Sequence, residues 1–280
     1  MTPIFRLFLP IVISAMCSNP DRVALMADMQ NRDFATQEQV VRAVAARDYY
    51  EYLVVAGDVV HAAGCWGVHA LDARWVEQMA VLAPLEGLEW HFAPGNHDYG
   101  YGYGDPHRYP ARQDALDAWD RWVGPRYHFF ESRHACFFLI DDMLWDDEQA
   151  IWLKGAVAAC GKSWKILVKH RPLRNPWPEF APAYTVEPNP SIWEQFGFDL
   201  VVAGHQHALA VWMQGRTLNI TLPPVCANVP PPYPISGQPA ITVVAVPMSG
   251  FAELEICSDA LAWRVFREDG LLLLGGRLDN

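Results

Sequence analysis

From residue 22 onward, the chain alternates between short apolar runs, typical of buried strands, and segments with apolar residues at helical spacing. The short runs predict strands over 23–27, 52–56, 89–93, 134–141, 165–169 and 200–203. The helical spacing predicts helices over 37–47, 72–85, 114–123, 147–159 and 192–196. Beyond residue 208 the pattern predicts strands alone, over 209–213, 217–221, 240–246, 251–256 and 261–266.

Strands that alternate with helices predict an α/β protein whose active site lies in the loops beyond the strand ends. No repeat or interdomain linker is visible in the sequence. The proline-rich stretches 172–190 and 223–239 are too apolar and aromatic to be flexible linkers, so we interpret them as ordered surface loops. We therefore expect residues 18–280 to form a single domain with a β-rich C-terminal segment from about residue 208.

The N-terminal segment has the pattern of a secretory signal peptide. A single positive charge at Arg6 precedes the apolar residues 7–16, and a polar break follows. This pattern predicts that residues 1–17 are a signal peptide cleaved after Cys17, and hence a secreted or periplasmic protein. The alternatives are a buried first strand or the ragged end of a cytoplasmic protein.

Composition narrows the class of protein. The chain is 51% hydrophobic and 19% charged, which excludes a disordered protein. Its 32 acidic and 21 basic residues give a net charge of −11, which repels a phosphate backbone, so we expect no nucleic-acid partner. No apolar run reaches the roughly 18–20 residues that span a bilayer, so we expect no membrane span.

The 6 cysteines lack the C-x-x-C spacing of zinc knuckles and thioredoxin-like motifs. Cys136 and Cys160 lie in apolar stretches, where we expect plain core residues. Cleavage after Cys17 would leave an odd number of cysteines. The cysteines alone therefore do not define the compartment.

Five polar clusters each follow a predicted strand directly. They are Asp28-Met29-Gln30, Gly57-Asp58-Val59-Val60-His61, Gly95-Asn96-His97-Asp98, Lys169-His170 and Gly204-His205-Gln206-His207. Carboxylate, amide and imidazole donors without thiolate suit divalent Mn, Fe, Zn or Mg. The glycines before Asp58, Asn96 and His205 allow sharp turns that bring backbone close to an ion.

This set of motifs resembles the calcineurin-like metallophosphoesterase superfamily, in its purple-acid-phosphatase-like or cyclic-nucleotide-phosphodiesterase-like branch. The superfamily pattern is D-x-H, G-D, G-N-H-[DE], a lone His after a strand, and G-H-x-H, and the similarity covers roughly residues 22–222. The resemblance implies a four-layer α/β/β/α sandwich, with two mixed sheets flanked by helices and the late β-rich segment completing the second sheet. It also implies a dinuclear metal site in the loops at the carboxyl ends of the strands.

The resemblance also implies a role for each site residue. Asp58 would bridge two divalent ions; Asp28 and His207 would hold the first ion, and Asn96, His170 and His205 the second. The ions would share a water and lower its pKa, which gives a hydroxide nucleophile for attack on phosphorus. His97 would protonate the leaving oxygen or stabilise the phosphoryl charge, and Asp98 would pair with its other nitrogen and raise its pKa.

Two positions depart from the family pattern. The first motif usually ends in His, where this chain has Gln30, and an amide oxygen is the weaker donor. His61 stands where purple acid phosphatases have a metal-binding Tyr. We therefore expect Gln30 or His61 to complete the first site, with His61 as an additional metal or substrate contact or a plain loop histidine.

The sequence thus predicts a phosphoesterase acting on a small phosphomonoester or phosphodiester. The alternatives are a non-catalytic metal-binding scaffold of the same fold and a nuclease, which the acidic charge disfavours. Two neighbouring features allow two interpretations each. The loop from Tyr99 to Asp105 would be either an aromatic wall against the substrate or a surface loop with part-buried rings. Arg171 and Arg174 would either bind a phosphate group of the substrate or be ordinary solvated arginines.

Overall fold

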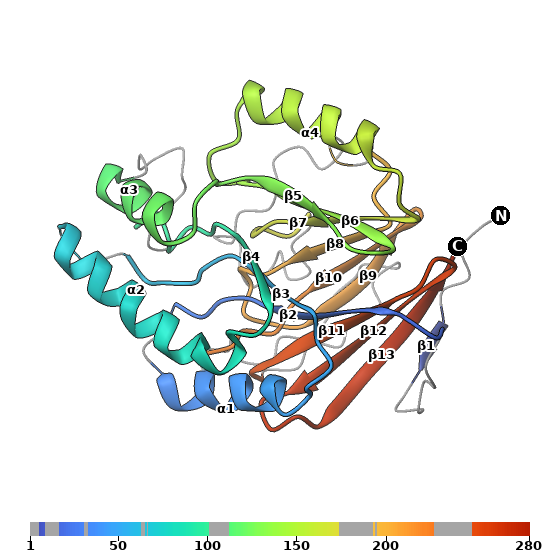
Figure 1. The fold of residues 1–280 in the computed structure, drawn as a ribbon, viewed down its shortest axis with the longest axis horizontal. Coiled ribbons are helices and arrows are strands. Elements are labelled where there is room, and N and C mark those ends of the chain that lie inside the picture. Colours follow the sequence, from blue (N-terminus) through green and yellow to red (C-terminus); the bar gives the residue numbers. More distant parts are fainter. Residues whose placement is uncertain are drawn as a thin grey trace, which may run out of the picture.

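The structure is a computed structural model that describes residues 6–8, 17–30, 33–62, 65, 67–100, 112–173, 193, 195–226 and 248–280. These residues form two β-sheets that face each other, with helices on the outer sides of both (Figure 1). The predicted strand 240–246 lies outside the described residues, as do two of the five residues of the predicted helix 192–196.

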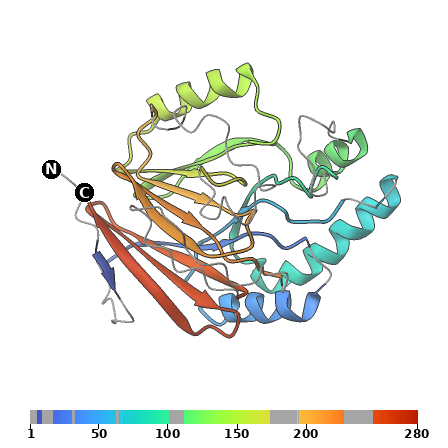
Figure 2. The same ribbon diagram turned by 180° about the vertical axis from the view of Figure 1, so that it is seen from behind.

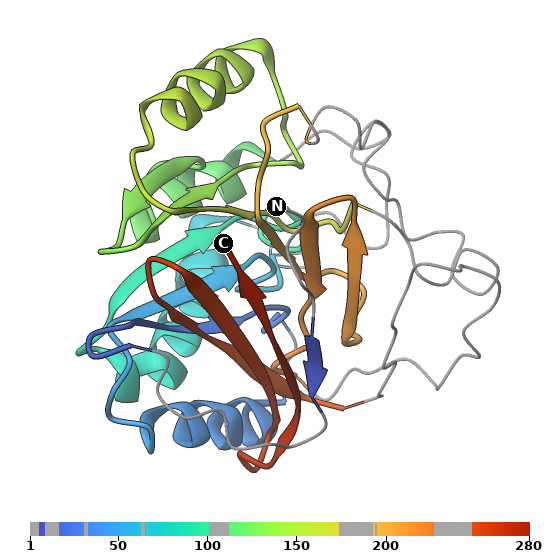
Figure 3. The same cartoon turned by 90° about the vertical axis from the view of Figure 1, so that its right-hand side faces the viewer.

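The first sheet has the order β1-β13-β12-β11-β2-β3-β4. Its strands are β1 Arg6–Phe8, β2 Asp21–Met26, β3 Tyr52–Ala56, β4 Glu89–Ala93, β11 Gly250–Ile256, β12 Ala260–Arg267 and β13 Leu272–Asp279. Strands β2, β3 and β4 are parallel, and the C-terminal strands join them through the antiparallel pair β11–β2 (Figure 3). The expectation that the late β-rich segment completes the second sheet is therefore wrong for β11–β13.

The second sheet has the order β5-β6-β7-β8-β10-β9. Its strands are β5 His128–Glu131, β6 Ala135–Leu139, β7 Trp164–Val168, β8 Leu200–Ala203, β9 Ala210–Gln214 and β10 Thr217–Thr221. The four central strands β6, β7, β8 and β10 are parallel, and antiparallel β5 and β9 close the two edges. The early part of the β-rich segment, β9 and β10, does belong to this sheet, as expected.

The helices whose bounds the described residues define cover the outer faces; they are α1 Phe34–Ala45, α2 Val68–Leu82, the 3-10 turn η1 Ala83–Leu85, α3 Gln113–Trp122 and α4 Asp147–Ala159. Asp33 and Asp146 cap α1 and α4 by accepting hydrogen bonds from Thr36 N and Gln149 N. Figure 2 shows α1 and α2 on the side of the first sheet and α4 on the opposite side of the molecule.

Three apolar cores separate these layers. One lies between the first sheet and α1–α3, one between the two sheets, and one between the second sheet and α4. Strand β3 illustrates the local cause: four of its five residues are buried apolar side chains, because the strand has a core on each of its faces. The layers confirm the predicted α/β/β/α sandwich with two mixed sheets.

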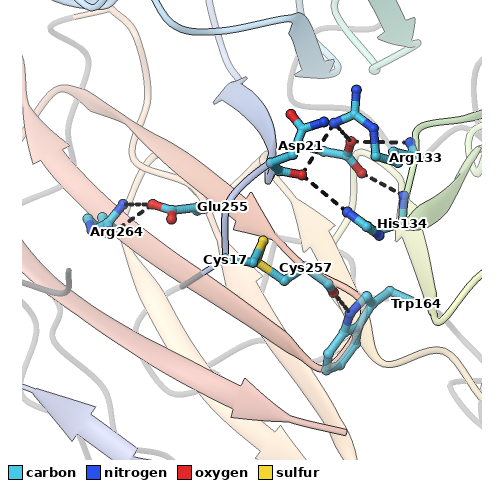
Figure 4. The surroundings of a disulfide bond; sticks show 9 residues. Cys17, Asp21, Arg133, His134, Trp164, Glu255, Cys257 and Arg264 are labelled. Carbon is cyan, nitrogen blue, oxygen red and sulfur yellow. Dashed lines mark hydrogen bonds and ion pairs between the residues drawn. A yellow bond between two sulfur atoms is a disulfide. The ribbon is translucent and has the colours of Figure 1, made fainter. Parts of the chain in front are cut away.

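Two disulfides cross-link the chain. Cys136, expected to be a plain core residue, is bonded to Cys160 at the end of α4, so that expectation is wrong for both. Cys17 is bonded to Cys257 just after β11 (Figure 4). The expected signal-peptide cut after Cys17 would remove one half of this bond, so the boundary at residue 17 remains a prediction. Among the described residues, no helix is long and apolar enough to cross a bilayer.

Close to this disulfide, Asp21 ties the two sheets together (Figure 4). Its buried carboxylate accepts hydrogen bonds from Ser132 Oγ at 2.7 Å, Arg133 N at 3.2 Å and His134 N at 2.7 Å, all in the turn between β5 and β6. The indole of Trp164 donates to Cys257 O at 2.7 Å. These bonds fix the end of the sandwich at which β2 begins.

Candidate metal centre

The predicted ligands lie in loops that follow the carboxyl ends of parallel strands. Asp28 follows β2, Asp58 follows β3 and Asn96 follows β4, whereas His170 follows β7 and the His205–His207 segment follows β8. Parallel strands bring their carboxyl ends to the same edge of a sheet. Because the two sheets face each other, loops from both edges meet at one end of the sandwich.

Four of these side chains form one cluster. His170 Nε2 lies 3.2 Å from Asp58 Oδ2 and 3.1 Å from Asn96 Oδ1. His205 Nδ1 lies 2.9 Å from the same Asn96 oxygen and 3.2 Å from His170 Nε2. The three residues assigned to the second ion therefore lie within hydrogen-bond distance of one another, and His170 among them also lies that close to the predicted bridging carboxylate.

The residues assigned to the first ion lie next to this cluster. His207 Nε2 is 3.5 Å from Asp28 Oδ1 and 2.8 Å from Gln30 Nε2. Asp28, Asp58 and His170, all buried, each offer one ligand atom within 4.8 Å of the others. Gln30 Oε1 is buried without a hydrogen-bond partner, and such an oxygen is a natural cation ligand. Carboxylates, imidazoles and a vacant amide oxygen fit divalent ions.

The ring of His170 is oriented by a bond that crosses between the sheets. Its Nδ1 lies 3.0 Å from Ala56 O, at the end of β3. Because a carbonyl can only accept, Nδ1 carries the hydrogen and Nε2 keeps the lone pair that faces Asp58 when the ring is neutral.

Four ligand residues adopt backbone conformations that L-residues rarely take. The φ angles are 57° at Asp28, 56° at Asp58, 72° at His205 and 52° at His207, and among the described residues no other non-glycine has a positive φ. Such conformations cost of order 1–3 kcal/mol each and persist where the surrounding structure enforces them, typically at functional sites. The fold thus strains the chain at predicted ligands and at no other described non-glycine position.

Three glycines leave room for the ligands. A Cβ would lie 2.4 Å from His170 Nδ1 at Gly57, 2.3 Å from Asp58 Oδ1 at Gly95 and 2.7 Å from Asp28 Oδ2 at Gly204. A carbon atom cannot approach a non-bonded nitrogen or oxygen so closely, so each position requires glycine. At these glycines the backbone does approach the predicted ligands closely, and their predicted closeness to an ion remains a prediction.

Charges in the site are arranged around Asp58 and His170. Burial by itself would raise the pKa of Asp58, but the imidazoles of His170 and His97 outweigh it and lower that pKa. Burial likewise opposes a charged His170, but Asp58 raises its pKa to about 10. Burial raises the pKa of Asp28 to about 6. Without an ion, a carboxylate–imidazolium pair therefore occupies the centre of the site, and a bound cation would replace its proton.

His97 lies beside Asp58. Its backbone N–H donates to Asp58 Oδ1 at 2.7 Å, and its Nε2 lies 4.0 Å from Asp58 Oδ2. We expected a raised pKa here, but burial, which the charge of Asp58 only partly offsets, lowers the pKa of His97 to about 4. The ring of His61 is tilted against that of His97, with the centroids 4.6 Å apart, so His61 lies next to the predicted leaving-group residue.

Asp98 has a role that we did not predict. Its Oδ2 accepts hydrogen bonds from Asp58 N at 2.9 Å and Gly95 N at 2.7 Å, and its Oδ1 accepts one from Val60 N at 2.8 Å. The carboxylate thereby ties the β3 and β4 loops together. The predicted pairing of Asp98 with the His97 ring remains a prediction.

Sequence reasoning missed two carboxylates just beyond the end of β6, Asp141 and Asp142. Of the predicted loop 99–105, Tyr99 is buried and donates its hydroxyl hydrogen to Asp141 Oδ2 at 2.9 Å, so this tyrosine is a core residue. Residues 101–105 lie outside the described part of the chain. Arg171 is buried against Asp142, with Nε 3.3 Å from Oδ2, so it is not a solvated arginine; the phosphate clamp stays a prediction, and Arg174 is not described. Two acidic residues at a strand end were the signal that could have identified the pair.

The comparisons with known proteins agree with this geometry. The sequence model of the calcineurin-like phosphoesterase family matches residues 21–209. No curated protein matches the sequence. The fold is similar to yellow lupin (Lupinus luteus) purple acid phosphatase PPD1, with a TM-score of 0.74 and 16% identity; the match covers 96% of this chain but only 55% of that one.

Two further solved structures share the fold. GAP50, described as the anchor in the inner membrane complex of Plasmodium, has a TM-score of 0.67 and 14% identity, and the match covers 93% of this chain and 89% of GAP50. PhoD has a TM-score of 0.68 and 11% identity, with 95% and 70% coverage. At these identities the likeness shows the fold alone. Because the family model spans about two thirds of the sequence, the chain belongs to the calcineurin-like phosphoesterase family.

Proposed function

We propose that this protein is a metal-dependent phosphoesterase that hydrolyses a small phosphomonoester or phosphodiester. One observation carries the proposal: Asp28, Asp58 and His170 come from three different strand ends, yet their buried ligand atoms lie within 4.8 Å of one another. Buried carboxylates that lie this close together destabilise the folded protein unless a cation compensates their charge. The shape and donor chemistry of the cluster suit such a cation.

Two divalent ions, Mn, Fe, Zn or Mg, would be held by seven residues. Asp28, Gln30 and His207 would bind the first ion, Asn96, His170 and His205 the second, and Asp58 both. When bound, such ions supply Lewis acidity toward a phosphoryl oxygen and lower the pKa of bound water. The protein contributes a rigid donor set, because strained backbone, the three glycines and the Ala56 carbonyl fix the ligands before any ion binds.

His97 would act on the departing group. Because its pKa is lowered to about 4, its ring is neutral at pH 7 in the ion-free protein and can donate one N–H to a phosphoryl or leaving oxygen. A bound phosphate anion nearby would favour the imidazolium and so allow proton transfer to the leaving oxygen. His61, whose ring is tilted against that of His97, would contact the substrate on the same side of the site.

The main alternative is a non-catalytic, metal-binding scaffold. The likeness to GAP50, the anchor in the inner membrane complex of Plasmodium, supports this alternative. His97 favours an enzyme, because a binding module gains nothing from an imidazole placed next to the ligand set. A nuclease is disfavoured by the net charge of −11. The two disulfides favour an oxidising compartment, hence a secreted or periplasmic protein.

A substrate panel tests the proposal. Wild-type protein loaded with Mn, Fe, Zn or Mg would be assayed on aryl and alkyl phosphomonoesters and on diesters, with Asp58→Asn as the inactive control. We expect hydrolysis with at least one metal and none by the variant. Protein that binds ions but hydrolyses no ester with any metal would favour the scaffold, and activity that survives in Asp58→Asn would contradict the assigned site.

A further inference from the structure

A cluster of buried charges lies directly behind His170. Asp142 follows β6, and Lys169 and Arg171 flank His170 after β7. Lys169 Nζ lies 3.3 Å from Asp142 Oδ2, and Arg171 Nε lies 3.3 Å from the same oxygen. All three are buried, with 1% exposure for Asp142, 0% for Lys169 and 5% for Arg171. None of the three was assigned a role by the predicted metal centre.

The carboxylate of Asp142 holds the backbone that carries His170. The N–H of His170 donates to Asp142 Oδ1 at 3.2 Å, and the N–H of Arg171 donates to Asp142 Oδ2 at 3.0 Å. The guanidinium of Arg171 also donates to the backbone oxygen of Asp142. Since β6 and β7 pair in parallel, the end of β6 lies beside the end of β7 and delivers the carboxylate there.

His170 is therefore fixed on two sides. Asp142 holds its backbone from within the second sheet, and Ala56 O accepts from its ring Nδ1 across the gap to the first sheet. These two constraints together define the direction in which Nε2 points. Loss of either one would free the ring to turn away from Asp58.

The two cations compensate the charge of Asp142. A carboxylate at this depth would be unstable alone, and a lysine with no exposed surface requires a counter-charge. Lys169 Nζ also lies over the ring of Trp193, at 4.8 Å from the centroid, which adds a cation–π contact. Asp142, Lys169 and Arg171 thus form one connected group of charges. Its carboxylate accepts the backbone N–H of the predicted metal ligand.

We propose that Asp142 is a positioning residue for the second ion: it acts through the backbone of His170 to set the direction of the imidazole. The proposal rests on the proposed metal centre, and it goes beyond that centre by assigning metal affinity to a residue that is not a ligand. An Asn at this position keeps the shape but replaces one acceptor oxygen by an NH₂ group that faces an N–H donor. Changes to residues that orient ligands typically weaken metal binding about 10–100-fold.

Three variants separate positioning from general stabilisation. Asp142→Asn disrupts the hydrogen bonds from the backbone N–H groups of residues 170 and 171 to this carboxylate, which we call the Asp142 clamp. Asp142→Asn combined with Lys169→Met also disrupts the clamp, but it removes the lysine that would otherwise be buried without its carboxylate partner, so the double variant should stay folded. Asp21→Asn is the matched control, because Asp21 is equally buried and also accepts two consecutive backbone N–H groups, but at the end of the sandwich at which β2 begins.

The measurement is the number of Mn²⁺ or Zn²⁺ ions bound per chain and their dissociation constants, by competition with a chromogenic chelator, alongside circular dichroism. We expect about 10–100-fold weaker binding of one ion in the single and the double variant, and wild-type affinity in Asp21→Asn. Wild-type affinity in a folded Asp142→Asn or double variant would overturn the proposal, as would an equal loss in Asp21→Asn. Wild-type protein that binds no ion at all would instead overturn the proposed function on which the inference rests.

Discussion

Replacement of Gly95 by Ala should abolish metal binding through a single added methyl group. The new Cβ would lie 2.3 Å from Asp58 Oδ1 and 2.4 Å from Asp58 N. Favourable carbon contacts begin near roughly 3.5 Å, so either the Gly95 loop or the Asp58 loop must move by about 1 Å. Neither can move freely, because Gly95 N and Asp58 N both donate to Asp98 Oδ2, at 2.7 and 2.9 Å.

The Gly95→Ala substitution should reduce the stability of the protein in two ways. Overpacking of this kind destabilises a folded protein by about 1–3 kcal/mol, which lowers the melting temperature of the ion-free protein. The displaced Asp58 would also lose its shared position between the two ions. A ligand present at 100 times its dissociation constant adds about 2.7 kcal/mol of stability, and this metal-dependent increment should disappear in Gly95→Ala.

Thermal unfolding with and without Mn²⁺ or Zn²⁺ measures both effects. Gly87→Ala is the matched control, since Gly87 is exposed and a Cβ there would meet nothing within 4 Å. The control should retain the full metal-induced rise in melting temperature. A Gly95→Ala protein that shows the same rise as wild type would refute the reasoning that this glycine makes room for the bridging carboxylate.

Three further predictions concern the site and the disulfides. His97→Ala should keep both ions but lose most turnover on esters with poor leaving groups; equal losses on activated and unactivated esters would contradict its role as a proton donor. Although burial opposes it, Asp58 raises the pKa of His170 to about 10, so below that pH an ion must displace a proton and its affinity should rise with pH. Calorimetry in buffers of different ionisation enthalpy counts the released proton, and a pH-independent affinity would argue against this pair. A peptide map under non-reducing conditions should recover Cys17 joined to Cys257, whereas mature protein that begins at residue 18 would support the signal-peptide cut and exclude this bond.

The sequence predicted the central strands well because their signals are local. Strands β3, β4, β8 and β10 and helix α4 have the predicted bounds, since each is a compact apolar or amphipathic run. Strand β13 was missed because Gly275 and Gly276 interrupt its pattern, and glycine is normally depleted in strands. Only the structure reveals the reason for Gly276: a Cβ there would lie 2.7 Å from the ring of Trp263.

The ligands could be proposed from sequence because each one follows a strand end within a short motif. Their orientation could not, since it depends on contacts between segments far apart in the chain. The bond from His170 Nδ1 to Ala56 O and the clamp from Asp142 both cross such distances, 114 and 28 residues. The disulfide between Cys136 and Cys160 was missed for the same reason, because an apolar context predicts burial and says nothing about a partner.

The central claim is that side chains from both sheets together hold two divalent ions around Asp58. Metal analysis of protein reconstituted with Mn²⁺ or Zn²⁺ and freed of excess ion tests it most directly, with Asp58→Asn measured in parallel. We predict two ions per wild-type chain and at most one, weakly held, in the variant. Folded wild-type protein that retains no ion, or a variant that retains two ions as tightly as wild type, would contradict the account.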